Sequence, residues 1–453
     1  MKSSVRTFKL EEKIVKGLTA TEKKILPILV QAVKQVDKIF LVQENDLYKG
    51  ANLYPHDATR EEIEQAAEDN SRIFSPFTIV KRDNTGKLIA VDYHKEYSKV
   101  LASVSSLLQK ASKHSDNKSF KRYLETLSMG LAEGKYQESD RAWLAIKDSN
   151  IEVIIGPHER YIDKLFFIKR AYQASVGIID REKTQRAKFI RDILYTTTGY
   201  RLQRVTPPSI VDVQVQNCIV MSGFLGRAIF SRQHLPSDTE TTERYGSRIL
   251  GYLSAIDFKF ERFTYPIFNA IFEKNFRASY SKKLLEEGNY YYVLLTAIAQ
   301  QLHRYRNSRS RLKELFPILD EANSVVSGIT HAKHLVLKGV IDQKTLEAIM
   351  IAQICWAFSE WILYRTSNLR EDYLKGDALI FNFLIREGAL QEKSGISWPN
   401  FAKMFFEMEN LAVIFTRFLE EGEYLEAQEF LSKYLSLEPF KDFDQHLIKI
   451  KPL

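Results

Sequence analysis

One stretch of the sequence places its residues at the spacing of a zinc-binding helix. It reads TAIAQQLHRYRN, and its histidine is His303. Two histidines four residues apart on a helix can bind one zinc ion, and a glutamate directly after the first can take a proton from the zinc-bound water. Here these two positions hold Ala299 and Gln300. Alanine cannot bind a metal and neutral glutamine cannot act as a general base, so the pattern predicts a zinc motif without its first ligand and its base.

His303 also has a simpler interpretation, as a histidine that makes a local hydrogen bond near the end of its helix. Basic residues follow it, with a tyrosine among them: Arg304, Arg306, Arg309, Arg311 and Lys313. Such a run can bind phosphate backbones. Cations that offset the dipole of a helix end explain the run at least as well. We therefore favour no nucleic-acid partner.

A second pair of histidines lies in the segment THAKH, where His331 and His334 are three residues apart. Side chains at this spacing share one face of a helix and can contact the same ion. The pair is therefore a candidate for a relocated metal site, and its alternative is an ordinary helix surface.

The composition is that of a globular protein. Of 453 residues, 45% are hydrophobic, and 65 basic against 57 acidic residues give a net charge of only +8. Two cysteines far apart, Cys218 and Cys355, form neither a disulfide framework nor a cysteine-based zinc site. The N-terminal residues lack the apolar middle of a signal peptide, and no apolar run reaches the length of a membrane span. We expect no membrane association and a reducing, cytoplasmic setting.

The hydrophobic pattern predicts an α+β fold that is mostly α. Thr19 and Thr59 each precede a helical pattern, with a glutamate three residues later. Asp83 to Gly86 lies between two β-rich runs, which indicates a hairpin. A strand is expected at 150–157, β structure near 204–223, and helices from about 246 to the end. The segment 161–180 could be a strand or a helix by its period alone, and 164–174 favours a helix.

Several segments, taken together and in order, resemble the dipeptidyl peptidase III family of zinc peptidases. The resemblance is strongest to its shorter bacterial members, which are also found fused to Nudix domains in plants. The segments include LYPHDATREEIE, SPFTIVKRDNTGKLIAVDY, IGPHERYID, RYGSRILGYLSAIDFKFERFTYPIF and LDEANSVVSGITHAKHLVLKGVI. The resemblance implies two lobes around a cleft. We therefore expect an N-terminal helical segment (1–48), a mixed part with the hairpin and a β core (49–245), and a helical lobe with the altered zinc motif (246–453).

The same resemblance assigns roles to individual residues. His303 and Glu321 match metal ligands, although Glu321 can instead cap a helix or pair with the nearby arginines. Glu159 and Tyr161 match positions that hold the amino end of a peptide and stabilise an oxyanion; their alternative is a structural role. Tyr373 stands where the family has a histidine in contact with the substrate.

These residues predict a protein that has kept the peptidase fold but lost the catalytic centre. We expect it to bind a peptide or a small amine-bearing ligand in the cleft, without a cofactor; if any metal binds, it is zinc. One alternative is a metal-dependent hydrolase that uses relocated ligands among His331, His334 and Tyr373. The other is a subunit that acts through protein contacts at its surface.

Overall fold

The computed structural model describes residues 3–45, 47–198, 211–302, 305, 307–365, 371–391 and 399–452. The chain divides into two compact units. Unit 1 comprises Met1–Thr184 and Ser209–Ala255, and unit 2 comprises Gln185–Pro208 and Ile256–Leu453. The boundary after Thr184 falls within α9 (Arg181–Thr198), and the boundary after Ala255 falls within α12 (Leu253–Lys259).

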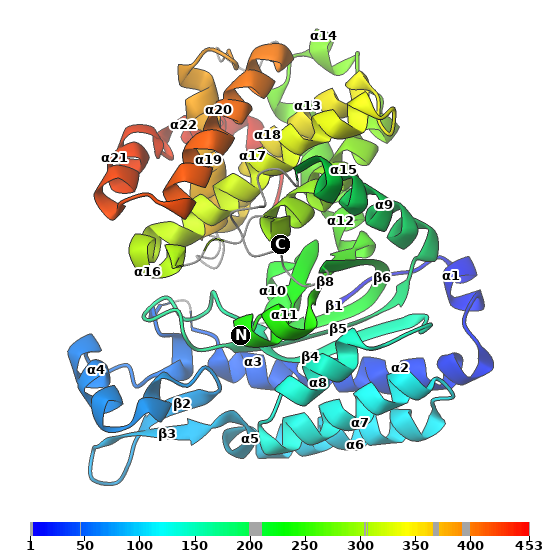
Figure 1. The fold of residues 1–453 in the computed structure, drawn as a ribbon, viewed down its shortest axis with the longest axis vertical. Helices are drawn as coiled ribbons and strands as arrows, with labels where there is room; N and C mark the ends of the chain where they lie inside the picture. The colour runs from blue at the N-terminus through cyan, green and yellow to red at the C-terminus, as the bar shows by residue number, and fades with distance from the viewer. Residues whose placement is uncertain are drawn as a thin grey trace. The chain divides into compact units, whose positions relative to one another are not determined.

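Unit 1 is built on a curled sheet (Figure 1). Among the described residues, six strands form it, in the order β4-β5-β6-β8-β7, with β1 paired to β6. Only the pairing of β6 with β8 is parallel. The strands are β1 (Arg6–Thr7), β4 (Ile151–Glu159), β5 (Ala171–Ile179), β6 (Val211–Gly223), β7 (Arg232–Leu235) and β8 (Ser247–Tyr252).

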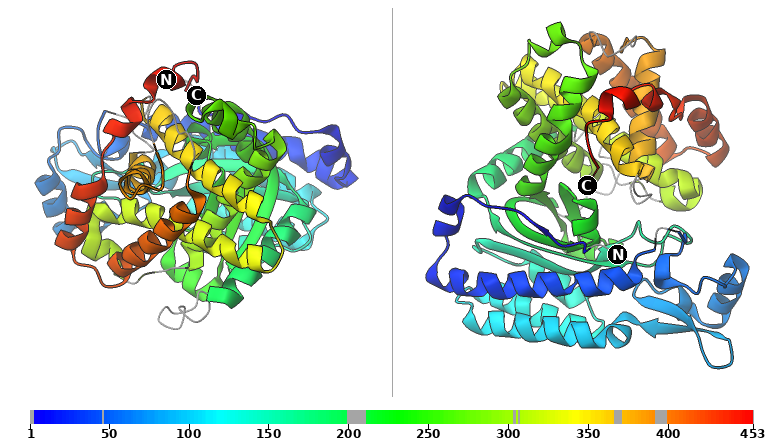
Figure 2. Two further views of the ribbon diagram at one scale, coloured as in Figure 1. Left: turned by 90° about the horizontal axis from the view of Figure 1, so that it is seen from above. Right: turned by 180° about the vertical axis from the view of Figure 1, so that it is seen from behind.

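Helices cover one face of this sheet in two layers, as Figure 2 shows for α2, α6 and α7. The predicted Thr19 cap is confirmed: its hydroxyl accepts from the backbone N–H of Glu22, whose carboxylate accepts from the N–H of Thr19. The helices of unit 1 are α1 (Glu12–Lys16), α2 (Ala20–Gln35), α3 (Asp37–Gln43), α4 (Arg60–Asp69), α5 (Tyr93–Glu96), α6 (Ser98–His114), α7 (Lys118–Glu133), α8 (Gln137–Leu144), α10 (Phe224–Ala228) and α11 (Thr239–Tyr245).

The predicted hairpin is also present, as β2 (Thr78–Arg82) paired with β3 (Leu88–Asp92). The helix predicted at 164–174 is wrong. Residues from Ala171 form β5, and the residues before it form a loop held by the carboxylate of Asp163. The alternation of strand residues was hidden because both faces of β5 are buried.

Unit 2 is helical in its described residues. Its main helices are α13 (Tyr265–Ile271), α14 (Lys274–Arg277), α15 (Lys282–Leu302), α16 (Ser308–Leu312), α17 (Phe316–Leu337), α18 (Gln343–Tyr364), α19 (Glu371–Arg386), α20 (Phe401–Glu420), α21 (Tyr424–Tyr434), α22 (Glu438–Lys441) and α23 (Asp444–Leu447). In the described chain, only α18 is long and apolar enough to cross a membrane, but 94% of its apolar window is buried, as in a core helix. The α+β, mostly α, prediction is confirmed.

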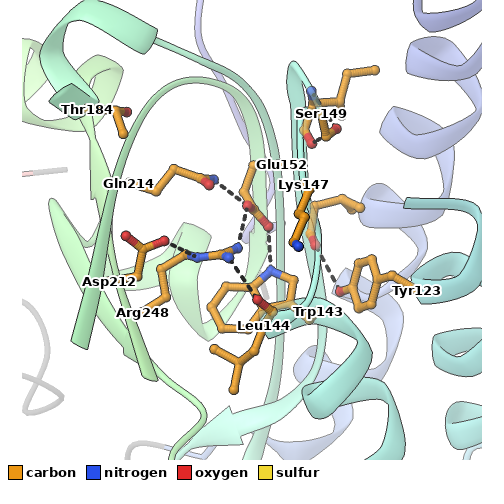
Figure 3. A network of polar contacts seen from close by, with 12 residues as sticks. Tyr123, Trp143, Leu144, Lys147, Ser149, Glu152, Thr184, Asp212, Gln214 and Arg248 are labelled. Atoms are coloured by element: carbon orange, nitrogen blue, oxygen red, sulfur yellow. Dashed lines mark hydrogen bonds and ion pairs between the residues drawn. The ribbon is translucent and has the colours of Figure 1, made fainter. Parts of the chain in front are cut away.

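A buried polar network fixes α8 to the sheet of unit 1 (Figure 3). At its centre is Glu152, which is 1% exposed. Its carboxylate accepts from the indole of Trp143 at 2.6 Å and from the amide of Gln214. The guanidinium of Arg248 lies 3.6 Å from Glu152 and 3.3 Å from Asp212, and it also stacks over the Trp143 ring. Every charge in this network therefore has a partner.

Removing one partner from this network should cost far more than removing an exposed ion pair. Arg248→Met leaves the buried Glu152 carboxylate without a cation, so we expect a loss of about 3–5 kcal/mol in the free energy of unfolding at pH 8. Arg82→Met, which breaks the solvent-exposed ion pairs with Glu62 and Asp57, should cost much less, because water screens these charges. Urea unfolding measures both; equal losses would contradict this account.

Candidate functional site

Two helices of unit 2 carry the residues at the predicted metal positions, and they cross closely. A Cβ atom added to Gly328 of α17 would lie 2.8 Å from the backbone nitrogen of Thr296 on α15. A glycine is therefore required at this crossing. Gln300 lies one helical turn beyond Thr296, and Glu321 lies about two turns before Gly328. The crossing thus brings Gln300 and Glu321 together.

The amide nitrogen of Gln300 lies between two carboxylates. Its Nε2 atom is 3.3 Å from Oδ2 of Asp320 and 3.4 Å from Oε1 of Glu321. Glu321 is only 6% exposed, so its charge needs a donor nearby. The amide N–H groups supply that donor, and they point at the acids. A group in this role donates protons in hydrogen bonds and cannot take one from water.

The residues around this amide–carboxylate contact add few polar groups to it. Ala299 is 1% exposed and adds only a methyl group to the core of unit 2. On α19, a Cβ atom at Gly376 would lie 3.5 Å from Cβ of Glu321, so this helix passes close to the acid. Tyr373 lies one turn earlier on α19 and is half-buried. Its predicted contact with a substrate stays a prediction.

Of the histidines considered from the sequence, His303 lies outside the described residues. The rings of His331 and His334 on α17 have centroids 6.3 Å apart. Burial and the cations of Lys333 and Lys338 hold the pKa of His334 below its usual value. In the portion of the chain that the structure describes, no three histidine, cysteine or acidic side chains could hold one ion together.

The residues present do not fit the zinc ion that the family resemblance implies. A catalytic zinc needs three protein ligands and an open position for water. At the position of one ligand stands the methyl group of Ala299. The remaining acid of the motif, Glu321, has the amide nitrogen of Gln300 3.4 Å from its Oε1 atom.

In unit 1, Glu159 and Tyr161 lie at the end of β4 and in the loop that follows. The Oε1 atom of Glu159 accepts from the backbone nitrogen of Arg160 at 2.8 Å and from that of Tyr161 at 2.7 Å. Glu159 is 5% exposed, and this burial raises the pKa of its carboxyl to about 7. The carboxylate thus shapes the turn that presents Tyr161, and it can still change protonation near neutral pH.

The loop after Tyr161 is organised by a residue that the sequence did not single out. Asp163, fully buried, accepts from four backbone N–H groups between 165 and 169 and from the hydroxyl of Tyr54 at 3.0 Å. The ammonium group of Lys169 is also buried; it donates to the carbonyls of Ile73 and Ser75 and to a threonine hydroxyl. Both residues hold the loop that follows Tyr161 in place.

Comparison with known proteins agrees with this fold. The model of peptidase family M49 matches residues 23–192. Nudix hydrolase 3 of Arabidopsis thaliana is 25% identical over 439 residues, which cover 89% of this chain and 56% of the plant protein. The chain thus spans about half the length of that relative.

Two solved structures extend the match over the whole fold. Dipeptidyl peptidase III from Caldithrix abyssi has a TM-score of 0.83 and 25% identity, covering 98% of this chain and 96% of that one. Dipeptidyl peptidase III from Corallococcus sp. strain EGB has a TM-score of 0.82 and 22% identity, covering 99% and 94%. The chain therefore has the fold of dipeptidyl peptidase III, and part of its sequence is similar to peptidase family M49.

The raised pKa of Glu159 predicts a pH-dependent stability. Between pH 5 and 8 the folded protein holds a proton that the unfolded chain has released, so the free energy of unfolding should fall, by up to about 3 kcal/mol for this group. Burial also raises the pKa of Asp140 to about 7, which adds a slope of the same sign. Glu159→Gln should therefore flatten the curve in part, while Glu62→Gln, an exposed control, should not. An unchanged slope in Glu159→Gln would contradict the assignment.

Proposed function

We propose that this chain is a non-hydrolytic relative of dipeptidyl peptidase III, which binds a peptide or a small amine-bearing ligand. The observation that carries the proposal is the contact of the Gln300 amide with Asp320 and Glu321, next to the methyl group of Ala299. A peptidase centre at this crossing would need a base and a ligand at those two positions. The buried, unpaired cysteines Cys218 and Cys355 agree with a reducing, cytoplasmic setting.

The lack of both a metal ligand and a general base would lower the rate of hydrolysis enough to support a non-hydrolytic role. Removing only an outer-shell partner of a metal ligand costs about 10- to 100-fold in affinity or activity, and losing a ligand itself costs more. Losing the general base removes roughly another 10²- to 10⁴-fold. The two losses apply together, because Ala299 and Gln300 are neighbours in one helix.

Groups suited to ligand contact are nevertheless present in unit 1. The Glu159 carboxyl retains its Oε2 atom for a further contact, since only Oε1 receives the backbone donors. Tyr161 is half-buried on a loop that the Asp163 carboxylate holds in place. A firmly held loop reduces the entropy that a ligand must overcome on binding. This arrangement favours binding without chemistry.

The proposal predicts how the centre responds when the two missing groups are restored. Ala299→His should increase the affinity for zinc by at least tenfold, because it supplies a third ligand beside His303 and Glu321. Ala299→His combined with Gln300→Glu should in addition release dipeptides from a peptide arylamide. Plasma emission spectroscopy measures the metal, and fluorescence measures the hydrolysis.

The single variant is the matched control for the double variant, because it has the ligand but not the base. The unmodified chain, incubated with zinc, should release no dipeptide. Zinc-dependent hydrolysis by the unmodified chain that disappears in Glu321→Ala would overturn the proposal.

A further inference from the structure

Nine large apolar side chains are exposed in the described part of the chain, and four of them lie near one another in unit 2. These four are Leu337 at the end of α17, Phe406 and Val413 on α20, and Leu425 at the start of α21. Exposed apolar side chains that stand singly need no explanation, whereas a group of them marks a contact surface. The contacts between α17, α20 and α21 show that the four form such a group.

Helices α17 and α20 lie side by side and run in opposite directions (Figure 1). Tyr305 accepts a hydrogen bond from Asn323 of α17 at 3.3 Å and donates one to Thr416 of α20 at 3.5 Å. Further along α17, Lys333 forms an ion pair with Glu409, which comes earlier in α20 than Thr416. The end of α17 therefore lies beside the first half of α20.

The apolar side chains follow one stripe along this helix pair. Leu337 is one turn beyond Lys333 on α17. Phe406 is one turn before Glu409 on α20, so it lies at the same end of the pair as Leu337. Val413 is one turn beyond Glu409 and shares a face of α20 with Phe406. The ion pair of Lys333 with Glu409 thus has apolar side chains on both sides along the helices.

The stripe continues onto α21. Arg417 is one turn beyond Val413 and forms an ion pair with Glu426 at 2.5 Å. Leu425 directly precedes Glu426 and is 74% exposed. We call the four apolar residues, together with the two ion pairs between them, the α20 stripe. It extends along α20 from Phe406 to the end of the helix, which is about 20 Å.

The two ends of the α20 stripe carry opposite charges. The end with Leu337 and Phe406 is basic, and the end with Leu425 is acidic. The charged residues there are Lys338 and Lys403 at the first end, and Glu420, Glu421 and Glu423 at the second. None of these five forms an ion pair with another residue that the structure describes. Their charges are therefore available to a partner.

A stripe with opposite charges at its ends is complementary to a second copy of itself. Lys403 and Glu421 are five full helical turns apart, so they lie on the same side of α20. Val413 lies close to midway between them. With a second copy antiparallel on the stripe and the two-fold axis at Val413, Lys403 of each copy would face Glu421 of the other. A parallel arrangement would instead bring like charges together.

We propose that the α20 stripe is the interface of a homodimer, in which α20 of one copy packs antiparallel against α20 of the second. This inference is independent of the proposed function, because the stripe needs neither a ligand nor a metal. Two helices about 10 Å wide over about 20 Å offer roughly 400 Å² per copy, about half of what a standard interface buries on each partner. The dimer should therefore be weak and form at high protein concentration.

Sedimentation velocity of the full chain measures this association. We expect a monomer at about 1 μM and a rising share of dimer toward about 200 μM, as for a transient interface of this size. Val413→Arg places two like charges at the two-fold axis and should weaken dimerisation by at least tenfold. Because Val413 is 55% exposed, this change should leave the monomer folded, which circular dichroism checks.

Met129 on α7 provides a matched control. It is 58% exposed and belongs to unit 1, outside the α20 stripe. Met129→Arg adds the same charge to an equally exposed helix position, so it should leave dimerisation unchanged.

A charge exchange tests the antiparallel arrangement. Lys403→Glu and Glu421→Lys each bring like charges together at both ends of the homodimer, so each should dimerise about three- to tenfold more weakly. An equal mixture of the two variants should restore dimerisation, because each altered end then meets an opposite charge on the other chain.

Each outcome decides for or against the interface. A chain that remains monomeric at about 200 μM overturns the proposal. A dimer that Val413→Arg leaves unchanged, or that Met129→Arg weakens equally, has its interface elsewhere and also overturns it. A mixture that dimerises no better than its two components contradicts the antiparallel arrangement. If Val413→Arg does not fold, the mixture of charge variants decides the question.

Discussion

The helix crossing in unit 2 depends on how a buried acid is compensated. Glu321 lies where α15 and α17 approach within the distance that only glycine at 328 permits. An acid there needs either a cation or hydrogen-bond donors. Gln300 supplies donors from the side chain, to this acid and to Asp320. The amide of Gln300 thus helps to compensate this buried acid, and an uncharged amide at this position cannot act as a general base.

Buried polar side chains in unit 1 differ in how many hydrogen-bond partners they have. Glu152 is surrounded by Trp143, Gln214 and Arg248, and this closed network has nothing left to offer a ligand (Figure 3). Gln173, in the next strand, is equally buried and has no partner among the described residues. Stability alone selects for the first arrangement, because an orphaned amide costs free energy.

Much of the fold could be predicted from local sequence patterns, such as helix caps and turns. Thr19 and Thr59 begin helices as their capping patterns predict, and the Asp83–Gly86 turn joins β2 to β3. The helix predicted for the region before β5 was wrong because the structure of this region depends on residues distant in the sequence. One example is the hydroxyl of Tyr54, which donates to the carboxylate of Asp163. From the sequence, Gln300 could be recognised only as a replacement for the base. Its contact with two carboxylates could not be predicted, because they lie on another helix and no local pattern predicts how the two helices cross.

The face that Glu159 and Gln173 share could not be predicted from the sequence. Glu159 and Gln173 share a face only because the register shifts at His158; without the shift, His158 itself would pair opposite Ala171 and point to the same face as Gln173, and Glu159 to the opposite face. Fold similarity at 25% identity is compatible with a glutamine at the position of the base, because a fold fixes where side chains stand and not which chemistry they carry.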